Sequence, residues 1–409
     1  MQCRFCKNNL SEVFIDLGES PLSNSFLTKE DLNLQEKYYP LKVYVCTSCF
    51  LVQTGEEKKP EEIFNEKYVY YSSYSVSWLR HAEEYVKMMI KRFGYNEKSF
   101  VIEVASNDGY LLQYFQKENI PVLGIEPSGG TAEVAQMKGI NTRVEYFGKE
   151  NAEWMAKQNI KADLLIGNNV LAHVPDINDF AEGLRIILKD DGIITMEFPH
   201  LMQLVINNQF DTIYHEHFFY YSLSTVSTIL KKHGLEIFDV EQLDTHGGSL
   251  RIFANNVNSS KYGISENVFN LLERENNLRM STPGFYRSFQ KAAEEVKENF
   301  VEFLRQKKKE NKKIAGYGAA AKGNTLLNYC GAGTDLIEYI VDVSPYKQGK
   351  YLPGTHIPVF AESIFNEDRP DYIVILPWNI KEEIINQLSY VRDWGAKFIV
   401  PIPSLEIIN

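Results

Sequence analysis

The chain has 409 residues, which is enough for two or three domains that each bury a substantial core. Its 44% hydrophobic and 24% charged residues are ordinary for a globular protein, and no run of about 18 apolar residues predicts a membrane-spanning helix. The net charge of -11 argues against broad nucleic-acid binding. The start, MQCRFCKNNL, lacks the apolar core of a signal peptide, so we expect a cytoplasmic protein. From the charge and the lack of a long apolar run, we expect no nucleic-acid or membrane partner.

Four of the five cysteines stand in two Cys-x-x-Cys pairs, Cys3 with Cys6 and Cys46 with Cys49. Each pair lets two thiolates approach one ion, and two pairs complete a tetrahedral shell of four sulfurs. In a reducing compartment this spacing favours metal over disulfides. Strand-like runs at 12–17 and 41–45 lie beside the pairs, with a loop over 18–26 between them. We therefore predict a zinc-ribbon-like domain over residues 1–60 with a structural zinc ion; free thiol turns or a redox dithiol are the alternatives.

A tyrosine-rich segment follows, with Tyr68, Tyr70, Tyr71 and Tyr74 ahead of Trp78 and an amphipathic helix over 79–92. Tyrosine offers apolar area together with a polar hydroxyl, so Tyr70 or Tyr71 is expected to close a ligand site. An aromatic strap over the core is the alternative.

From residue 100 the pattern alternates between apolar strands and helices. The predicted strands cover residues 99–105, 122–125, 142–146, 162–167 and 192–198, and the predicted helices cover 111–117, 131–138 and 177–188. This alternation predicts an open, doubly wound α/β sheet, here assigned to a domain over 61–285. Two further strands at 235–241 and 249–254 form an antiparallel hairpin, a layout that resembles class I methyltransferases.

The ligand of such a sheet binds at the carboxyl ends of its strands. A dinucleotide needs Gly-x-Gly-x-x-Gly there, whereas the turn after the first strand reads Ala105-Ser106-Asn107-Asp108-Gly109 and has one glycine. This acidic turn suits the sulfonium and amino groups of S-adenosylmethionine, and Glu126 after the second strand is placed to accept two ribose hydroxyls. The pattern favours S-adenosylmethionine over NAD.

Three consecutive titratable residues, His215, Glu216 and His217, follow Tyr214 in the aromatic segment 212–221. Aromatic neighbours make charged forms expensive, which suits histidines that transfer protons. The alternative is a half-buried amphipathic segment. Because the segment is inserted after strand 192–198, it should lie beside the methyl donor, and this placement favours the catalytic interpretation.

A charged helix over 288–313 leads into a second α/β unit that starts at residue 313. Its glycine-rich turn, Gly316-Tyr317-Gly318-Ala319-Ala320-Ala321-Lys322, could place backbone amides and Lys322 around a phosphate. Strands at 337–341, 372–375 and 396–400 continue a small parallel sheet. The alternative is a purely structural Rossmann-like domain.

The chain combines a zinc-binding start, a methyltransferase core and a Rossmann-like end, in this order. This arrangement resembles that of the sugar C-methyltransferases of deoxysugar pathways, which methylate nucleotide-linked 4-keto sugars. The resemblance covers essentially the whole chain and includes the paired cysteine turns, residues 103–109, 124–127, 169–176, 214–217 and 316–323. It implies a methyl donor in the central domain and a nucleotide sugar held between that domain and the C-terminal domain over 286–409. The expected donor-site residues are Tyr71, Glu103, Ser106, Asn107, Asp108, Gly109, Glu126, Pro127, Asn168 and Asn169.

Transfer to carbon requires a carbanion equivalent, which a base can form beside a 4-keto group. We predict His217 as this base, with Glu216 and Tyr214 beside it. His173 is expected to donate to the enolate oxygen or to hold the sugar, and Tyr71 to close the site. The expected substrate-binding residues are His215, Tyr220, Tyr317, Gly318, Ala319, Lys322, Asn324 and Asp342.

The resulting hypothesis is an S-adenosylmethionine-dependent enzyme that adds a branch methyl, at C-3, to a nucleotide-linked 4-keto deoxysugar. An O- or N-methyltransferase is the nearest rival; a non-catalytic zinc-ribbon scaffold and a nicotinamide oxidoreductase are more distant ones. The sequence names neither the sugar nor the nucleotide, and it leaves the oligomeric state open, with a monomer favoured.

Overall fold

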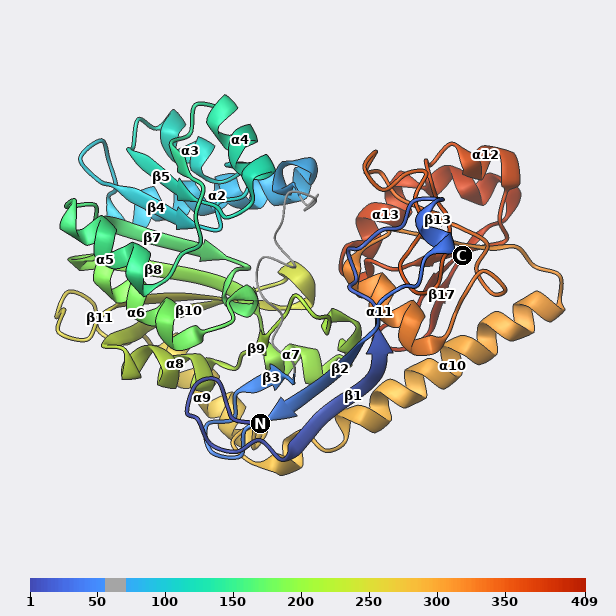
Figure 1. The fold of residues 1–409 in the computed structure, drawn as a ribbon, viewed down its shortest axis with the longest axis horizontal. Coiled ribbons are helices and arrows are strands. Elements are labelled where there is room, and N and C mark those ends of the chain that lie inside the picture. Colours follow the sequence, from blue (N-terminus) through green and yellow to red (C-terminus); the bar gives the residue numbers. More distant parts are fainter. Residues whose placement is uncertain (56–70) are drawn as a thin grey trace.

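Three β-sheets and one long connecting helix organise the protein. The computed structural model describes residues 1–55 and 71–409, in which the sheets have four, seven and six strands. The two larger sheets lie on opposite sides of the molecule, with the N-terminal strands below and between them (Figure 1). Helix α10 (Phe289–Lys309) runs along the base toward the six-stranded unit. Within the described part of the chain, no helix has both the length and the apolar character needed to span a membrane.

The N-terminal sheet is antiparallel, in the order β1 (Glu12–Ser20), β2 (Tyr39–Val45), β3 (Val52–Thr54) and β9 (Phe219–Tyr220). The predicted strands at 12–17 and 41–45 are confirmed. The loop expected from residue 18 starts only after Ser20, because Ser20 still pairs with Tyr39. The fourth strand comes from the histidine-bearing segment 212–221, so the N-terminal domain is built directly onto that segment.

The connection between β1 and β2 reaches the C-terminal domain. Leu27 and Tyr351 exchange two backbone hydrogen bonds of 2.9 Å, and the Glu36 carboxylate accepts from the Gly354 N–H at 3.0 Å. These contacts hold the loop between β1 and β2 against the C-terminal domain.

The central sheet has the strand order β10-β11-β8-β7-β4-β5-β6. Every neighbouring pair is parallel except those of β11, which runs antiparallel to both β10 and β8. The strands are β4 (Val101–Val104), β5 (Val122–Ile125), β6 (Thr142–Arg143), β7 (Ala162–Asn168), β8 (Leu188–Pro199), β10 (Leu235–Leu243) and β11 (Ser249–Asn256). β4 is buried at all four positions, as expected of a parallel strand covered on both faces. The doubly wound sheet with its antiparallel hairpin is confirmed.

Helices cover this sheet and connect its strands. They are α2 (Val76–Phe93), α3 (Leu112–Lys117), α4 (Gly129–Met137), α5 (Lys149–Lys157), α6 (Ile177–Ile187), α7 (Leu201–Ile206), α8 (Leu223–Lys232) and α9 (Glu266–Asn277). α2 begins three residues before the predicted start, because the Ser75 side chain accepts from the Trp78 N–H and caps the helix. Helices α5, α7, α8 and α9 were not predicted.

The C-terminal sheet has the order β14-β13-β12-β15-β16-β17 and is parallel except for β17. Its strands are β12 (Ile314–Tyr317), β13 (Ile340–Val341), β14 (Val359–Phe360), β15 (Tyr372–Ile375), β16 (Lys397–Val400) and β17 (Glu406–Ile408), and its helices are α11 (Ala321–Cys330), α12 (Ile364–Asp368) and α13 (Lys381–Gln387). The predicted Rossmann-like unit is present. The domain boundary expected after residue 60 lies outside the described residues, and the one expected after residue 285 falls between α9 and α10.

Candidate active site

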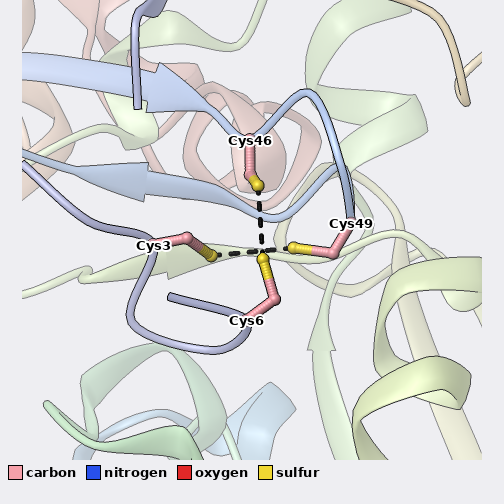
Figure 2. A group of neighbouring side chains, drawn as sticks. All are labelled: Cys3, Cys6, Cys46 and Cys49. Atoms are coloured by element: carbon pink, nitrogen blue, oxygen red, sulfur yellow. Dashed lines mark hydrogen bonds between the residues drawn. The ribbon is translucent and has the colours of Figure 1, made fainter. Parts of the chain in front are cut away.

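Four cysteine sulfurs meet at one point of the N-terminal domain (Figure 2). The Sγ atoms of Cys3 and Cys49 are 3.6 Å apart, those of Cys6 and Cys46 are 3.5 Å apart, and all four lie within 4.8 Å of one another. Tetrahedral zinc with metal–sulfur distances of about 2.3 Å requires sulfur–sulfur separations of about 3.8 Å, so this group fits the ion. Gln53 Nε2 donates to Cys3 Sγ at 3.2 Å, a contact that suits a thiolate. The predicted four-cysteine cluster is confirmed.

A cavity of about 620 Å³ lies between the carboxyl edge of the central sheet and the C-terminal domain. All three domains line it: Asn24 comes from the N-terminal domain, Glu126 and His217 from the central domain, and Lys322 and Lys347 from the C-terminal domain. The volume suits a small-molecule ligand. Carboxylate, imidazole and ammonium groups therefore share one site.

The turn after β4 shapes one part of this cavity. Ala105 and Asn107 have left-handed backbone conformations, with φ of 56° and 49°. The turn brings the Asn107 N–H to one oxygen of Glu126, and the Ser128 N–H donates to the other, both at 2.9 Å. Burial raises the pKa of Glu126. Each carboxylate oxygen has a further lone pair that can accept from a hydroxyl, so the donor set fits the ribose of S-adenosylmethionine.

A tight turn carries Tyr214 and His217 into the cavity together. The His217 N–H donates to the Tyr214 carbonyl at 2.9 Å, and the two rings lie 4.0 Å apart. The segment is thus neither the helix nor the strand that its pattern allowed. His217 Nδ1 lies 2.9 Å from the Thr212 carbonyl, which can only accept, so Nδ1 carries the proton and Nε2 the lone pair. Burial, with a smaller contribution from His173, lowers the pKa of His217 well below its ordinary value.

His173 and Glu216 complete this side of the site. The His173 ring lies 4.8 Å from that of His217, and its Nδ1 donates to the Glu216 carbonyl at 2.8 Å. Burial lowers the pKa of His173 to about 4. The Glu216 side chain accepts from Asn24 Nδ2 at 2.6 Å, and burial raises its pKa to about 7. At neutral pH both histidines are therefore neutral and can accept a proton.

Comparison with known proteins identifies the family. Residues 244–403 match a model described as "C-methyltransferase C-terminal domain", residues 3–64 a "Putative zinc binding domain" and residues 78–240 a "Methyltransferase domain". The C-methyltransferase NovU of Streptomyces niveus is 34% identical over 408 residues, covering 100% of this chain and 97% of that protein. The chain belongs to the C-methyltransferase family. It is an S-adenosylmethionine-dependent enzyme, and the expected class I methyltransferase fold is confirmed.

Other similarities of this C-methyltransferase are partial. The ubiquinone biosynthesis O-methyltransferase of Chelativorans sp. (strain BNC1) is 27% identical over 95 residues, which are 23% of this chain and 38% of that protein. Magnesium protoporphyrin IX methyltransferase from Synechocystis PCC 6803, solved with bound S-adenosylmethionine, is 14% identical, with a TM-score of 0.34. That match covers 47% of this chain and 88% of that one.

Half of the predicted donor-site residues line the cavity of the C-methyltransferase: Asn107, Glu126, Pro127, Asn168 and Asn169. The other five do not line it: Tyr71, Glu103, Ser106, Asp108 and Gly109. Glu103 is only 1% exposed inside β4, and burial raises its pKa well above the ordinary value. Tyr71 stacks on Tyr346 of the C-terminal domain at 5.9 Å, and Tyr70 lies outside the described residues.

Among the predicted substrate residues, only Lys322 lines the cavity. The other seven are not among its lining residues: His215, Tyr220, Tyr317, Gly318, Ala319, Asn324 and Asp342. His215 Nε2 lies 3.3 Å from the Pro40 carbonyl and its ring packs on Tyr39, toward the N-terminal domain. Asn324 is fully buried behind the turn and Tyr220 lies within β9.

The glycine-rich turn of the C-terminal domain packs closely against its neighbours. The Ala319 N–H donates to the Asp342 carboxylate at 2.7 Å, so this backbone amide is paired within the protein. Side chains at Gly318 and Gly323 would lie 2.3 Å from Pro377 Cγ and 2.8 Å from Leu376 Cβ. Both glycines are needed for close approach of β15 and its following turn.

The sequence prediction gave no site role to many residues that line the cavity, among them Asn24, Trp78, His246 and Asn379. These four come from separate segments, and tertiary structure alone brings them together. His246 had a local signal, because a histidine directly before Gly247-Gly248 in a hairpin turn is an unusual place for a titratable side chain.

Proposed function

We propose that this C-methyltransferase adds a methyl group to the carbon beside the keto group, C-3, of a nucleotide-linked 4-keto deoxysugar. The observation that carries the proposal is the fixed tautomer of His217, whose unprotonated Nε2 belongs to a half-buried ring that lines the shared cavity. A C–H group becomes acidic only beside a group such as a carbonyl, and an imidazole that is neutral at pH 7 has a free nitrogen to accept the proton.

The C-terminal side of the cavity supports an anionic substrate. Lys322 and Lys347 both line it, and Lys322 Nζ is held by Asn379 Oδ1 at 2.7 Å. Lys347 Nζ donates to the Ala319 carbonyl at 2.8 Å, which fixes the ammonium group at the cavity edge. Two ammonium groups opposite the carboxylates of the central domain suit the diphosphate of a nucleotide sugar.

The reaction divides between a bound donor and residues of this chain. When bound at Glu126 and the turn after β4, S-adenosylmethionine supplies an electrophilic methyl group. His217 Nε2 takes the proton from the sugar carbon, the C–H electron pair forms a C=C bond and the carbonyl pair moves onto oxygen. Tyr214, whose ring lies tilted 4.0 Å from that of His217, holds the His217 ring, and Glu216 with Asn24 borders the sugar pocket. We further propose that a zinc ion binds the four cysteines and has a structural role.

Incubation with labelled S-adenosylmethionine and a panel of nucleotide-linked 4-keto sugars tests the proposal. We expect a product with a new C–C bond by NMR, and His217→Asn should reduce turnover by about 10²- to 10⁴-fold. A methyl on oxygen or nitrogen, or unchanged turnover of the variant, would contradict the assignment. His233→Asn, a histidine outside the cavity, is the control and should leave turnover unchanged.

A further inference from the structure

A third histidine, His246, lines the cavity from the turn between β10 and β11. Its backbone is left-handed, with φ 54° and ψ 23°, a conformation that is uncommon for residues other than glycine, although asparagine, aspartate and histidine adopt it more often than the rest. Asn169, which follows β7, also has a φ of 54° and donates from Nδ2 to His246 Nε2 at 3.1 Å. Two left-handed residues joined by a hydrogen bond at a cavity indicate a functional constraint.

The surrounding contacts hold His246 rigidly in this conformation. The neighbouring Thr245 Oγ1 donates to Glu197 Oε1 at 3.1 Å, and Gln209 Nε2 donates to the Gly247 carbonyl at 2.7 Å. A side chain at Gly247 would lie 2.4 Å from Trp378 Cη2 of the C-terminal domain. The turn is therefore wedged between two domains, and this packing offsets its backbone strain.

The hydrogen bond from Asn169 determines the tautomer of His246. An Nε2 that accepts has no proton, so the neutral ring carries its proton on Nδ1. No hydrogen bond joins Nδ1 to any of residues 1–55 or 71–409, and the ring borders the cavity. Burial lowers the pKa of His246 to about 4, so the ring is neutral near pH 7.

The three imidazoles of the cavity thus divide by role. His217 and His173 donate from Nδ1 to backbone carbonyls and so carry no proton on Nε2 when neutral. The expectation that His173 donates to the enolate oxygen conflicts with this tautomer. His246 differs from the other two, because its Nε2 accepts a hydrogen bond. The Nδ1–H of its neutral ring is therefore available for donation.

We propose that His246 is a catalytic residue that donates its Nδ1–H to the substrate oxygen on which the enolate charge develops. The proposal rests on the proposed function. As His217 Nε2 takes the carbon-bound proton, the carbonyl electron pair moves onto oxygen, and the Nδ1–H···O⁻ hydrogen bond strengthens while its proton stays on nitrogen. A fixed donor of this kind in a dry site contributes about 10²- to 10³-fold to the rate.

Two substitutions of His246 distinguish the effect of its Nδ1–H donor from the effect of its side-chain volume. In His246→Asn the amide N–H lies near the place of Nδ1, and asparagine tolerates the left-handed backbone. In His246→Gln the amide lies near the place of Nε2. We expect the glutamine variant to lose about 10²- to 10³-fold in turnover and in deuterium exchange at the substrate carbon, and the asparagine variant to keep most of both rates.

Calorimetry with S-adenosylmethionine should give the wild-type Kd for both variants, which shows that the fold and donor site are intact. His356→Asn is the matched control: His356 is also left-handed, with φ 56°, but lies outside the cavity beside Glu36. It should leave both rates unchanged. Equal rates in His246→Gln and the wild type, or equal losses in the Asn and Gln variants, would overturn the assignment. A wild-type enzyme inactive on every keto sugar nucleotide would instead contradict the proposed function.

Discussion

Among single residues, Glu216 gives the clearest pH dependence. Burial raises its pKa from 4.5 to about 7, although the hydrogen bond from Asn24 partly opposes the shift. The folded protein therefore holds a proton at Glu216 that the unfolded chain releases between these two pH values. Because the folded state binds more protons in this window, Glu216 makes the protein less stable as the pH rises through it.

Glu216→Gln keeps the shape and the contact with Asn24 but removes the titration. The variant should gain stability relative to the wild type between about pH 5 and about pH 8, by up to roughly 3 kcal/mol. Thermal unfolding of both proteins at the two pH values measures the difference. Glu83→Gln, on an exposed part of α2, should show little pH-dependent change. A constant difference between wild type and Glu216→Gln would show that the carboxyl group is already ionised at the lower pH.

Site residues could be predicted from the sequence when several titratable groups lie together in one segment. Glu216 and His217 are such a case, although their turn depends on the hydrogen bond between His217 and Tyr214 and had no periodic signal. Asn24 and Lys347 are more than three hundred residues apart and enter the cavity only through domain contacts. The roles of such residues follow from tertiary structure, which local pattern does not determine.

At the scale of elements, one sheet connects the four-cysteine group with the turn that carries His217. Gln53 of β3 donates to Cys3 Sγ at 3.2 Å and pairs with Phe219 of β9. The Thr54 N–H donates at 3.0 Å to the carbonyl of Phe218, which is the next residue in the chain after His217. Strands such as β5 and β15 were predictable from short apolar runs, whereas β9 has two residues and exists because β3, far away in sequence, pairs with it.

Removal of the proposed zinc ion should therefore loosen the turn that carries His217 as well as the N-terminal domain. A strong chelator, or Cys6→Ser, should lower Tm and increase amide hydrogen exchange at residues 217–220, because the sheet loses its anchor. Exchange in β16, which belongs to the C-terminal sheet, serves as the internal control and should not change. Added zinc should restore protection in the chelated wild type but not in Cys6→Ser. Unchanged exchange at 217–220 in a metal-depleted protein would contradict the coupling.

The whole molecule is needed to assemble the cavity, since the proposed base His217 and the proposed substrate-binding residue Lys322 come from different domains. Lys322 Nζ in the C-terminal domain donates to Asn379 Oδ1 at 2.7 Å and lies over the Trp378 ring at 4.5 Å. Burial lowers the pKa of Lys322, which Asp211 of the central domain partly opposes. The charge of Lys322 makes a small contribution to the lowered pKa of His217, after burial and the neighbouring histidines. In the proposed function, Lys322 would therefore link substrate binding to the protonation of His217.

Lys322→Gln should expose this coupling in two independent measurements. Loss of a charge-assisted contact should raise KM for the nucleotide sugar by about 10- to 100-fold, while KM for S-adenosylmethionine stays unchanged. Without the nearby cation the pKa of His217 should rise, so the acidic limb of the kcat/KM profile should move to higher pH. Lys381→Gln, in the same domain but outside the cavity, should change neither. A rise in both KM values with an unmoved pH profile would instead mean that Lys322 only holds the two domains together.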